Sequence, residues 1–324
     1  MIEVSGLVKR YGEKTAVSGL TFTVKPGVVT GFLGPNGAGK STTMRMIVGL
    51  DRPTAGSVTV NGRPYAHSPA PMTEVGLLLE AKAIHPGLSA HQYLLALGAT
   101  HGIGPRRVME VLDFVGLSAV AKKRSKGFSL GMGQRLGIAA ALLGDPKILI
   151  LDEPVNGLDI EGVRWVRTLL KELAAEGRTV FLSSHLMSEM ELTADHLIVI
   201  GQGRLIADTS VTDFAKRASG AASVLVRSPE AGRLRELVAG PTVSVSSDET
   251  GVLTVTGLES EEIGTIAGLN GITLYELTPQ KASLEEAFLE LTGDTVEYRA
   301  PAALAGAGAG AGARAGAGAS RRLS

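Results

Sequence analysis

One short stretch of the chain has the residue types and spacing of a phosphate-binding loop. Residues 34–41 read Gly-Pro-Asn-Gly-Ala-Gly-Lys-Ser and fit the pattern G-x-x-x-x-G-K-[ST]. In this pattern the glycines let backbone N–H groups converge on phosphate oxygens, Lys40 reaches the terminal phosphates, and the Ser41 hydroxyl can ligate Mg²⁺. A glycine-rich turn can also match by accident, since the chain contains 42 glycines.

The segments on either side of this loop favour phosphate binding. Residues 28–33 form a β-branched and apolar run that predicts a buried strand. Residues 42–50 place apolar side chains at helical spacing, so a helix is expected to begin at the loop. The helix dipole makes the N-terminus of that helix partially positive, which adds to the attraction of the backbone N–H groups for phosphate.

An acidic pair and a histidine follow two further predicted strands. Asp152 and Glu153 come directly after the apolar run 147–151, and His185 follows the run 179–184. Ligands of open α/β sheets bind outside the carboxyl ends of the strands, so these side chains are placed for chemistry. Asp152 could instead cap a helix, and a lone histidine is usually structural; Glu153 is not needed for capping. The other histidines show no metal-ligand spacing.

The rest of the pattern alternates strands and helices and predicts an α/β fold. Residues 89–116 are helical in pattern, which suggests a helical subdomain over about 85–145. A basic run at 122–126 has no interleaved aromatic residues, so it is interpreted as a solvated loop rather than a nucleic-acid patch.

Bulk composition narrows the class of protein. The chain has 324 residues, 44% of them hydrophobic, and its Lys+Arg and Asp+Glu counts are both 32. This length predicts two domains, and a net charge of zero provides no general attraction for nucleic acid. Cysteine is absent, which excludes disulfides and thiolate metal sites. The N-terminus does not read as a signal peptide, and the most apolar stretch, 136–144, is too short to span a bilayer. We therefore expect a cytoplasmic protein that reaches the membrane only through a partner.

The C-terminal third predicts a second, smaller unit. Residues 219–222 are all small (Ser-Gly-Ala-Ala), which indicates a domain boundary. Beyond them the predicted order strand–helix–strand–strand–helix–strand is that of a ferredoxin-like module. We predict a nucleotide-binding domain over 1–218 and an accessory α+β domain over 219–296. A last helix is expected at 283–291, and the Ala/Gly-rich tail 297–324 is expected to be disordered.

Taken in order, these motifs resemble the nucleotide-binding ATPase subunit of an ABC transporter, over about residues 1–218. The resemblance implies a P-loop NTPase cassette that binds ATP and Mg²⁺. It implies that Tyr11 stacks on adenine, although a lone Tyr is more often a packed surface residue. It also identifies 129–135 as the signature stretch, which contacts ATP held by an opposite subunit, and 156–159 as the D-loop. The implied nucleotide-binding residues are Tyr11, Gly34, Pro35, Asn36, Gly37, Ala38, Gly39, Lys40, Ser41, Thr42, Ser129 and Gly131.

The resemblance further implies three roles in the reaction. Glu153 is the catalytic glutamate, His185 the switch histidine, and Lys40 the lysine on the terminal phosphates. Ser41, Asp152 and Glu80 are the residues expected at the metal. Glu80 departs from the family pattern, which usually has Gln there, and so do Leu130 (usually Gly) and Met132 (usually Gln). These variants are similar to those of bacitracin- and lantibiotic-type exporters.

The expected function is that of an ATP-hydrolysing subunit. It dimerises on ATP, with a second copy of itself or with a paired ATPase subunit. The dimer powers a separate integral membrane permease at the cytoplasmic face of the membrane, exporting a drug or antibiotic. The permease contact is expected between Glu80 and Tyr93, and no nucleic acid is expected as a partner. Two alternatives stay open. One is a non-transport ABC ATPase that acts on ribosomes or nucleic acid, and the other is a regulatory module that senses ATP without useful hydrolysis.

Overall fold

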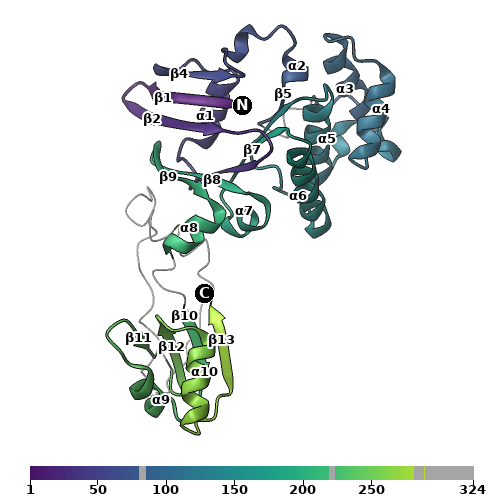
Figure 1. The fold of residues 1–324 in the computed structure, drawn as a ribbon. Helices are drawn as coiled ribbons and strands as arrows, with labels where there is room; N and C mark the ends of the chain where they lie inside the picture. The colour runs from purple at the N-terminus through teal and green to yellow at the C-terminus, as the bar shows by residue number, and fades with distance from the viewer. Residues whose placement is uncertain (80–84, 219–222, 248, 281–287, 289–324) are drawn as a thin grey trace, which may run out of the picture.

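A six-stranded sheet in the order β5-β6-β7-β3-β8-β9 forms the centre of the N-terminal part (Figure 1). The computed structural model describes residues 1–79, 85–218, 223–247, 249–280 and 288. Five of the strands are parallel, and β9 pairs antiparallel with β8 at the edge. The strands are β3 (Val29–Leu33), β5 (Val75–Leu78), β6 (Ile148–Leu151), β7 (Thr179–Ser184), β8 (His196–Gly201) and β9 (Arg204–Ser210).

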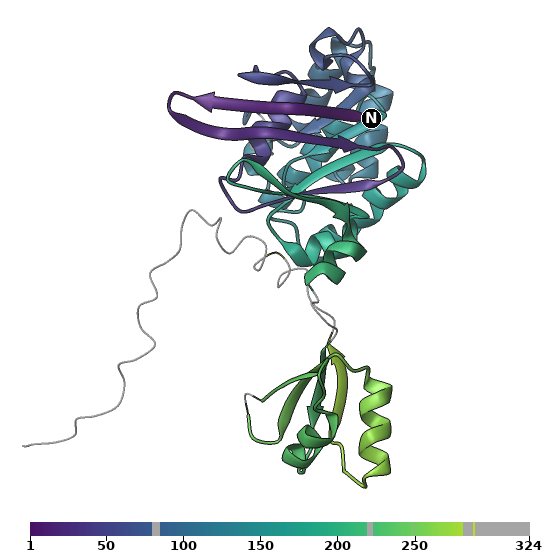
Figure 2. The ribbon, with the colours of Figure 1, turned by 60° about the vertical axis from the view of Figure 1, so that its left-hand side comes forward.

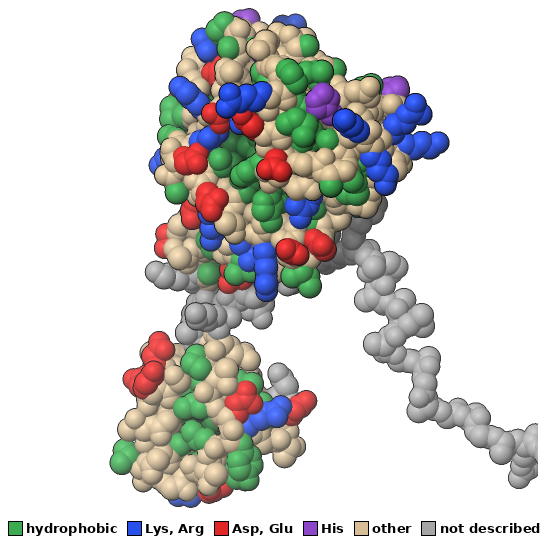
Figure 3. All heavy atoms as spheres, turned by 90° about the vertical axis from the view of Figure 1, so that its right-hand side faces the viewer, with side chains coloured by type: hydrophobic (Ala, Val, Ile, Leu, Met, Phe, Trp, Pro, Cys, Tyr) green, Lys and Arg blue, Asp and Glu red, His purple; other side chains and the backbone are tan. Residues whose placement is uncertain are grey.

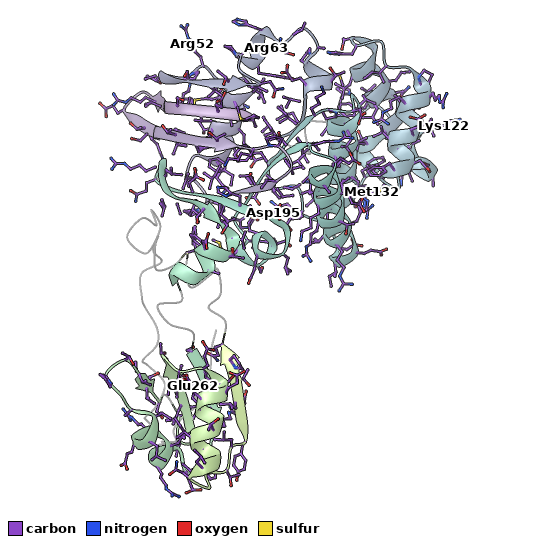
Figure 4. All side chains as sticks on the ribbon, in the orientation of Figure 1. Arg52, Arg63, Lys122, Met132, Asp195 and Glu262 are labelled. Atoms are coloured by element: carbon purple, nitrogen blue, oxygen red, sulfur yellow. The ribbon has the colours of Figure 1, made fainter. Side chains whose placement is uncertain are left out.

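The inner strands are apolar along their whole length because both faces of the sheet are covered. Every residue of β3, β6 and β7 is buried. On one side pack α6 (Ile160–Ala175) and α7 (Met187–Thr193), which contact β3 and β7. Asp195, labelled in Figure 4, fixes the start of β3, because its Oδ2 accepts the Val29 N–H at 2.9 Å.

An antiparallel sheet, β2-β1-β4, covers the other side of β3. Its strands are β1 (Ile2–Tyr11), β2 (Lys14–Val24) and β4 (Ala55–Val60), and helix α1 (Lys40–Ile47) packs against all three. The Phe22 ring of β2 lies 5.7 Å from that of Phe32 and 6.0 Å from that of Phe181, both in the central sheet, measured between ring centroids. This aromatic cluster holds the two sheets together and so fixes the loop between β3 and α1.

Helices α3 (Ala90–Ala99), α4 (Pro105–Phe114) and α5 (Leu130–Leu142) form a group opposite the β1-β2-β4 sheet (Figure 1). A capping box between Ser89 and Gln92 begins α3, and the Arg107 guanidinium donates to the carbonyls of Leu142 and Leu143 at the end of α5. Lys122 of the basic run lies at the outer side of this group (Figure 4). Acidic and basic side chains are both spread over the face seen in Figure 3.

The C-terminal strands form a sheet of their own, in the order β11-β12-β10-β13, with every pair antiparallel. Figure 2 shows the helices against one face of this sheet. The two strand–helix–strand halves interleave, because β12 lies between β10 and β11; this is the predicted split βαβ arrangement. The elements are β10 (Ser223–Arg227), α9 (Ala231–Val238), β11 (Ser244–Ser246), β12 (Val252–Thr256), α10 (Ser260–Leu269) and β13 (Glu276–Gln280).

Most predicted elements are present, with shifts at their ends. The last C-terminal strand was expected to begin at Ile272 but begins at Glu276. Before it, the Thr273 carbonyl accepts from the Ser228 hydroxyl and the Tyr275 N–H donates to Arg227 O. Short helical elements complete the chain: η1 (Tyr65–His67), α2 (Pro71–Glu74), η2 (Ser118–Val120), η3 (Ser125–Gly127) and α8 (Val211–Ala218). The predicted helix 283–291, apart from Phe288, and the tail 297–324 lie outside the described residues. The domain boundaries stay predictions.

Candidate active site

The loop between β3 and α1 has a backbone that depends on glycine. Gly37 and Gly39 have φ angles of 84° and 102°, in the left-handed region that side chains with a Cβ avoid. A Cβ at Gly39 would lie 2.6 Å from Ala16 O, and one at Gly34 would lie 2.5 Å from Ile200 O. The glycines therefore let the loop pass close to neighbouring backbone while α1 begins directly at Lys40. This is the strand–loop–helix arrangement predicted for a phosphate cradle.

Lys40 is held under this loop. Its side chain is buried, and its Nζ donates to Gly34 O at 2.6 Å and to Pro35 O at 3.3 Å. Burial lowers the pKa of the Lys40 ammonium, although the charges of Glu153 and Asp152 act in the opposite direction. A buried ammonium with mainly carbonyl partners favours an incoming anion, so the lysine suits a phosphate ligand.

The Glu153 side chain lies between those of His185 and Lys40, the two other residues predicted to take part in the reaction. Its Oε2 is 2.9 Å from His185 Nδ1, and its Oε1 is 3.8 Å from Lys40 Nζ. The three residues follow β6, β7 and β3, whose carboxyl ends lie at one edge of the parallel sheet. The sheet therefore brings together all three predicted catalytic side chains.

Ser183 completes this cluster, and sequence reasoning missed it. It is fully buried at the end of β7; its hydroxyl donates a short hydrogen bond to Asp152 Oδ1 and accepts the Glu153 N–H at 3.0 Å. The pairing of Leu151 with Leu182 brings these residues side by side. Serine in an apolar strand carries no signal by itself, so only the β6–β7 register identifies it.

Asp152 and Ser41 have the oxygen donors that Mg²⁺ prefers. Ser41 is exposed in the first turn of α1, and Asp152 is partly exposed at the end of β6. Both donors fit a Mg²⁺ ion held together with phosphate oxygens. No cluster of three or more His, Cys, Asp or Glu side chains that could hold a metal alone occurs in the described part of the chain. Glu80, the third predicted metal residue, lies outside the described residues.

Tyr11 lies at the end of β1 with half of its surface exposed. Its hydroxyl donates to Asp51 Oδ2 at 3.2 Å, and Lys9 Nζ lies 4.9 Å from the ring centroid. Desolvation and Asp51 raise the Tyr11 pKa, while Arg45 and Thr42 act against them. Thr42 belongs to the predicted nucleotide set, so the ring lies beside the phosphate-loop helix.

Ser129 and Gly131, the predicted signature contacts, belong to a different region. Ser129 caps α5, accepting the Met132 N–H at 3.2 Å; Met132 is labelled in Figure 4. A Cβ at Gly131 would lie 3.1 Å from Gly157 O. Helix α5 packs on β5, α3 and α4, whereas α1 packs on β1, β2 and β4. Within one chain, Gly131 therefore approaches the D-loop, and none of the described contacts of Ser129 and Gly131 is with the phosphate loop.

Comparisons with known proteins identify relatives of this chain. The ABC transporter family model matches residues 17–156, and a domain of unknown function, DUF8746, matches residues 222–285. The chain is 35% identical over 312 residues to the linearmycin resistance ATP-binding protein LnrL of Bacillus subtilis (strain 168), covering 91% of this chain and 99% of that protein. It is 41% identical over 220 residues to the bacitracin transport ATP-binding protein BcrA of Bacillus licheniformis, covering 67% and 72%.

A solved structure of an ATP-binding cassette has a similar fold. The dimeric post-hydrolysis structure of the ATP-binding cassette MJ0796, bound to ADP and Pi, is 25% identical and superimposes with a TM-score of 0.60. The match covers 65% of this chain and 99% of that one. No described helix of the present chain is both long and apolar enough to cross a membrane. The chain therefore belongs to the ATP-binding proteins of ABC transporters and is an ATPase of that family.

Proposed function

We propose that Gly34–Thr42 hold the phosphates of ATP and that Glu153 is the base that orients and deprotonates the attacking water. The observation that carries the proposal is the position of the Glu153 carboxylate, between His185 Nδ1 at 2.9 Å and Lys40 Nζ at 3.8 Å. A carboxylate with two basic neighbours at the carboxyl edge of the sheet can accept a proton close to where Lys40 binds phosphate.

The other residues of the site assist this step. Ser41 and Asp152 would hold Mg²⁺, which neutralises charge on the phosphate oxygens when it is bound. Lys40 exchanges its contacts with Gly34 O and Pro35 O for phosphate oxygens, and the Nε2 atom of His185, which does not contact Glu153, is available to the terminal phosphate. Tyr11 offers a ring face to the adenine.

A second copy of the chain completes each site in this proposal. Ser129 and Gly131 lie at the N-terminus of α5, where backbone N–H groups and the helix dipole favour an anion. Because they lie apart from the phosphate loop of their own chain, ATP would be enclosed between the phosphate loop of one copy and the signature of the other. The dimeric form of the MJ0796 cassette supports this arrangement.

The transport role follows from the relatives. LnrL is named for linearmycin resistance and BcrA for bacitracin transport. We infer that this chain works at the cytoplasmic face of the membrane, where its closing and opening would power a separate integral permease that exports an antibiotic-like amphipathic compound. These relatives give no support to the ribosome- or nucleic-acid-directed alternative. Crosslinks to a co-expressed permease are expected at residues 80–93; crosslinks only at 224–291 would contradict this contact.

The test of the reaction is ATP hydrolysis by the full chain and by E153Q and K40A. E153Q should bind ATP and dimerise on it, yet turn over at least about 100-fold more slowly, the usual contribution of a general base. K40A should lose nucleotide affinity. E172Q, at an exposed position of α6, is the matched control and should hydrolyse normally. Unchanged turnover in both E153Q and K40A would refute the proposed mechanism.

A further inference from the structure

Gln134 links the signature helix to the backbone of Glu153. It lies one turn after the start of α5, where its side chain is buried with 4% of its surface exposed. Its Nε2 donates to Glu153 O at 3.0 Å. We propose that Gln134 is a positioning residue for Glu153 and ties the direction of that carboxylate to the position of α5. This inference rests on the proposed catalytic role of Glu153.

The backbone of Glu153 needs such support, because it adopts a conformation that glutamate avoids. Its φ angle is 50°, in the left-handed region. Hydrogen bonds hold it on both sides. Its N–H donates to Ser183 Oγ at 3.0 Å, and its carbonyl accepts from Asn156 N at 3.2 Å as well as from Gln134. The bond from Asn156 is local and would move with the turn, whereas Gln134 fixes the turn to a separate helix.

A second contact of the same helix supports this reading. Leu130 and Gln134 are four residues apart, so they lie on one face of α5. Leu130 fills the space above Gly157, where an added Cβ would lie 2.2 Å from Leu130 Cδ2, and Gly131 approaches Gly157 O. One face of the first turn of α5 therefore contacts the chain from Glu153 to Gly157.

The consequence is a mechanical connection between the two composite sites. In the proposed dimer, α5 carries the signature that contacts the nucleotide bound by the other copy. A change in the position of α5 on that nucleotide would move Gln134, and through it the Glu153 carbonyl of its own chain. Each catalytic carboxylate would then be aligned only when the opposite site is closed.

The experiment measures kcat and KM for ATP, and the affinity for a fluorescent ATP analogue, in full-length Q134M and Q134E. Met keeps the length of Gln without a donor, and Q134E keeps its shape but presents an acceptor to the carbonyl. Both variants should lose about tenfold in kcat, or about 1.4 kcal/mol of transition-state stabilisation. Their KM and analogue affinity should stay within about twofold, because the phosphate loop is untouched. Q280M, at an exposed position of β13, is the matched control and should match the wild type.

Each outcome decides the proposal. A kcat within about twofold of wild type in the folded variants would overturn it, and so would a loss of nucleotide affinity parallel to the loss of kcat. If Q134M is poorly folded, Q134E decides; if neither folds, Gln134 serves stability and the proposal is wrong. E153Q, assayed alongside, separates a failure of the proposed catalytic role of Glu153 from a failure of the positioning role of Gln134. Normal turnover in E153Q would remove the catalytic role of Glu153, whereas an inactive E153Q with fully active Q134 variants would remove only the role of Gln134.

Discussion

Replacing Ser183 with alanine should damage both stability and catalysis, because one buried hydroxyl serves two partners. S183A removes the donor to Asp152 Oδ1 and the acceptor for the Glu153 N–H. A hydrogen bond to a charged group contributes about 1.5–3 kcal/mol, and an unsatisfied buried N–H costs about 1–3 kcal/mol.

These two losses share one site and do not simply add. We expect the free energy of unfolding of S183A to fall by about 3 kcal/mol. For a domain of this size the melting temperature should then fall by about 6–12 °C. Below that temperature, kcat should still be at least about tenfold lower, because Asp152 and Glu153 both lose the group that orients them.

The neighbouring Ser184 provides a matched control. It is equally buried, but its hydroxyl accepts the Leu186 N–H at 2.9 Å, and neither carboxylate is its partner. S184A should cost about 1 kcal/mol, as for loss of a local cap, with kcat within about threefold of wild type. Urea titration and steady-state ATPase assays on both variants test the reasoning. It fails if S183A hydrolyses ATP as fast as S184A.

Two further predictions concern the helices around the site. G157A should lower the free energy of unfolding by about 1–2 kcal/mol, since Gly157 has a φ of 76° and an added Cβ would collide with Leu130. In urea titrations, the double variant G157A/L130A should regain the part of the stability that the collision removes. Full stability of G157A alone would refute the contact. Burial raises the pKa of the Glu189 carboxyl above its ordinary 4.5, Arg167 opposes this shift, and Glu153 adds to it. A raised carboxyl pKa gives stability that is present at low pH and lost as pH rises through the folded value, so E189Q should gain melting temperature over wild type as pH rises above 4.5. The exposed control E191Q should show no such gain, and an equal gain in both would contradict the effect of burial.

The sequence alone determined the fold class and the main chemical groups. The phosphate loop is a local structure, so Gly34–Ser41 and the flanking apolar runs were enough to predict it. Asp152, Glu153 and His185 could be predicted because each directly follows an apolar strand, and the ends of parallel strands meet at one edge of a sheet. The order of elements after residue 222 likewise predicted the interleaved C-terminal sheet.

Only the tertiary structure decided which groups hold these side chains in place. Ser183 meets Asp152 through the register of two strands, and Gln134 meets Glu153 through the packing of α5. The left-handed backbone of Glu153 and the fit of Leu130 over Gly157 have no local signal either. Each depends on contacts between residues far apart in the chain, and such contacts are set by strand order and helix packing rather than by the spacing of residue types.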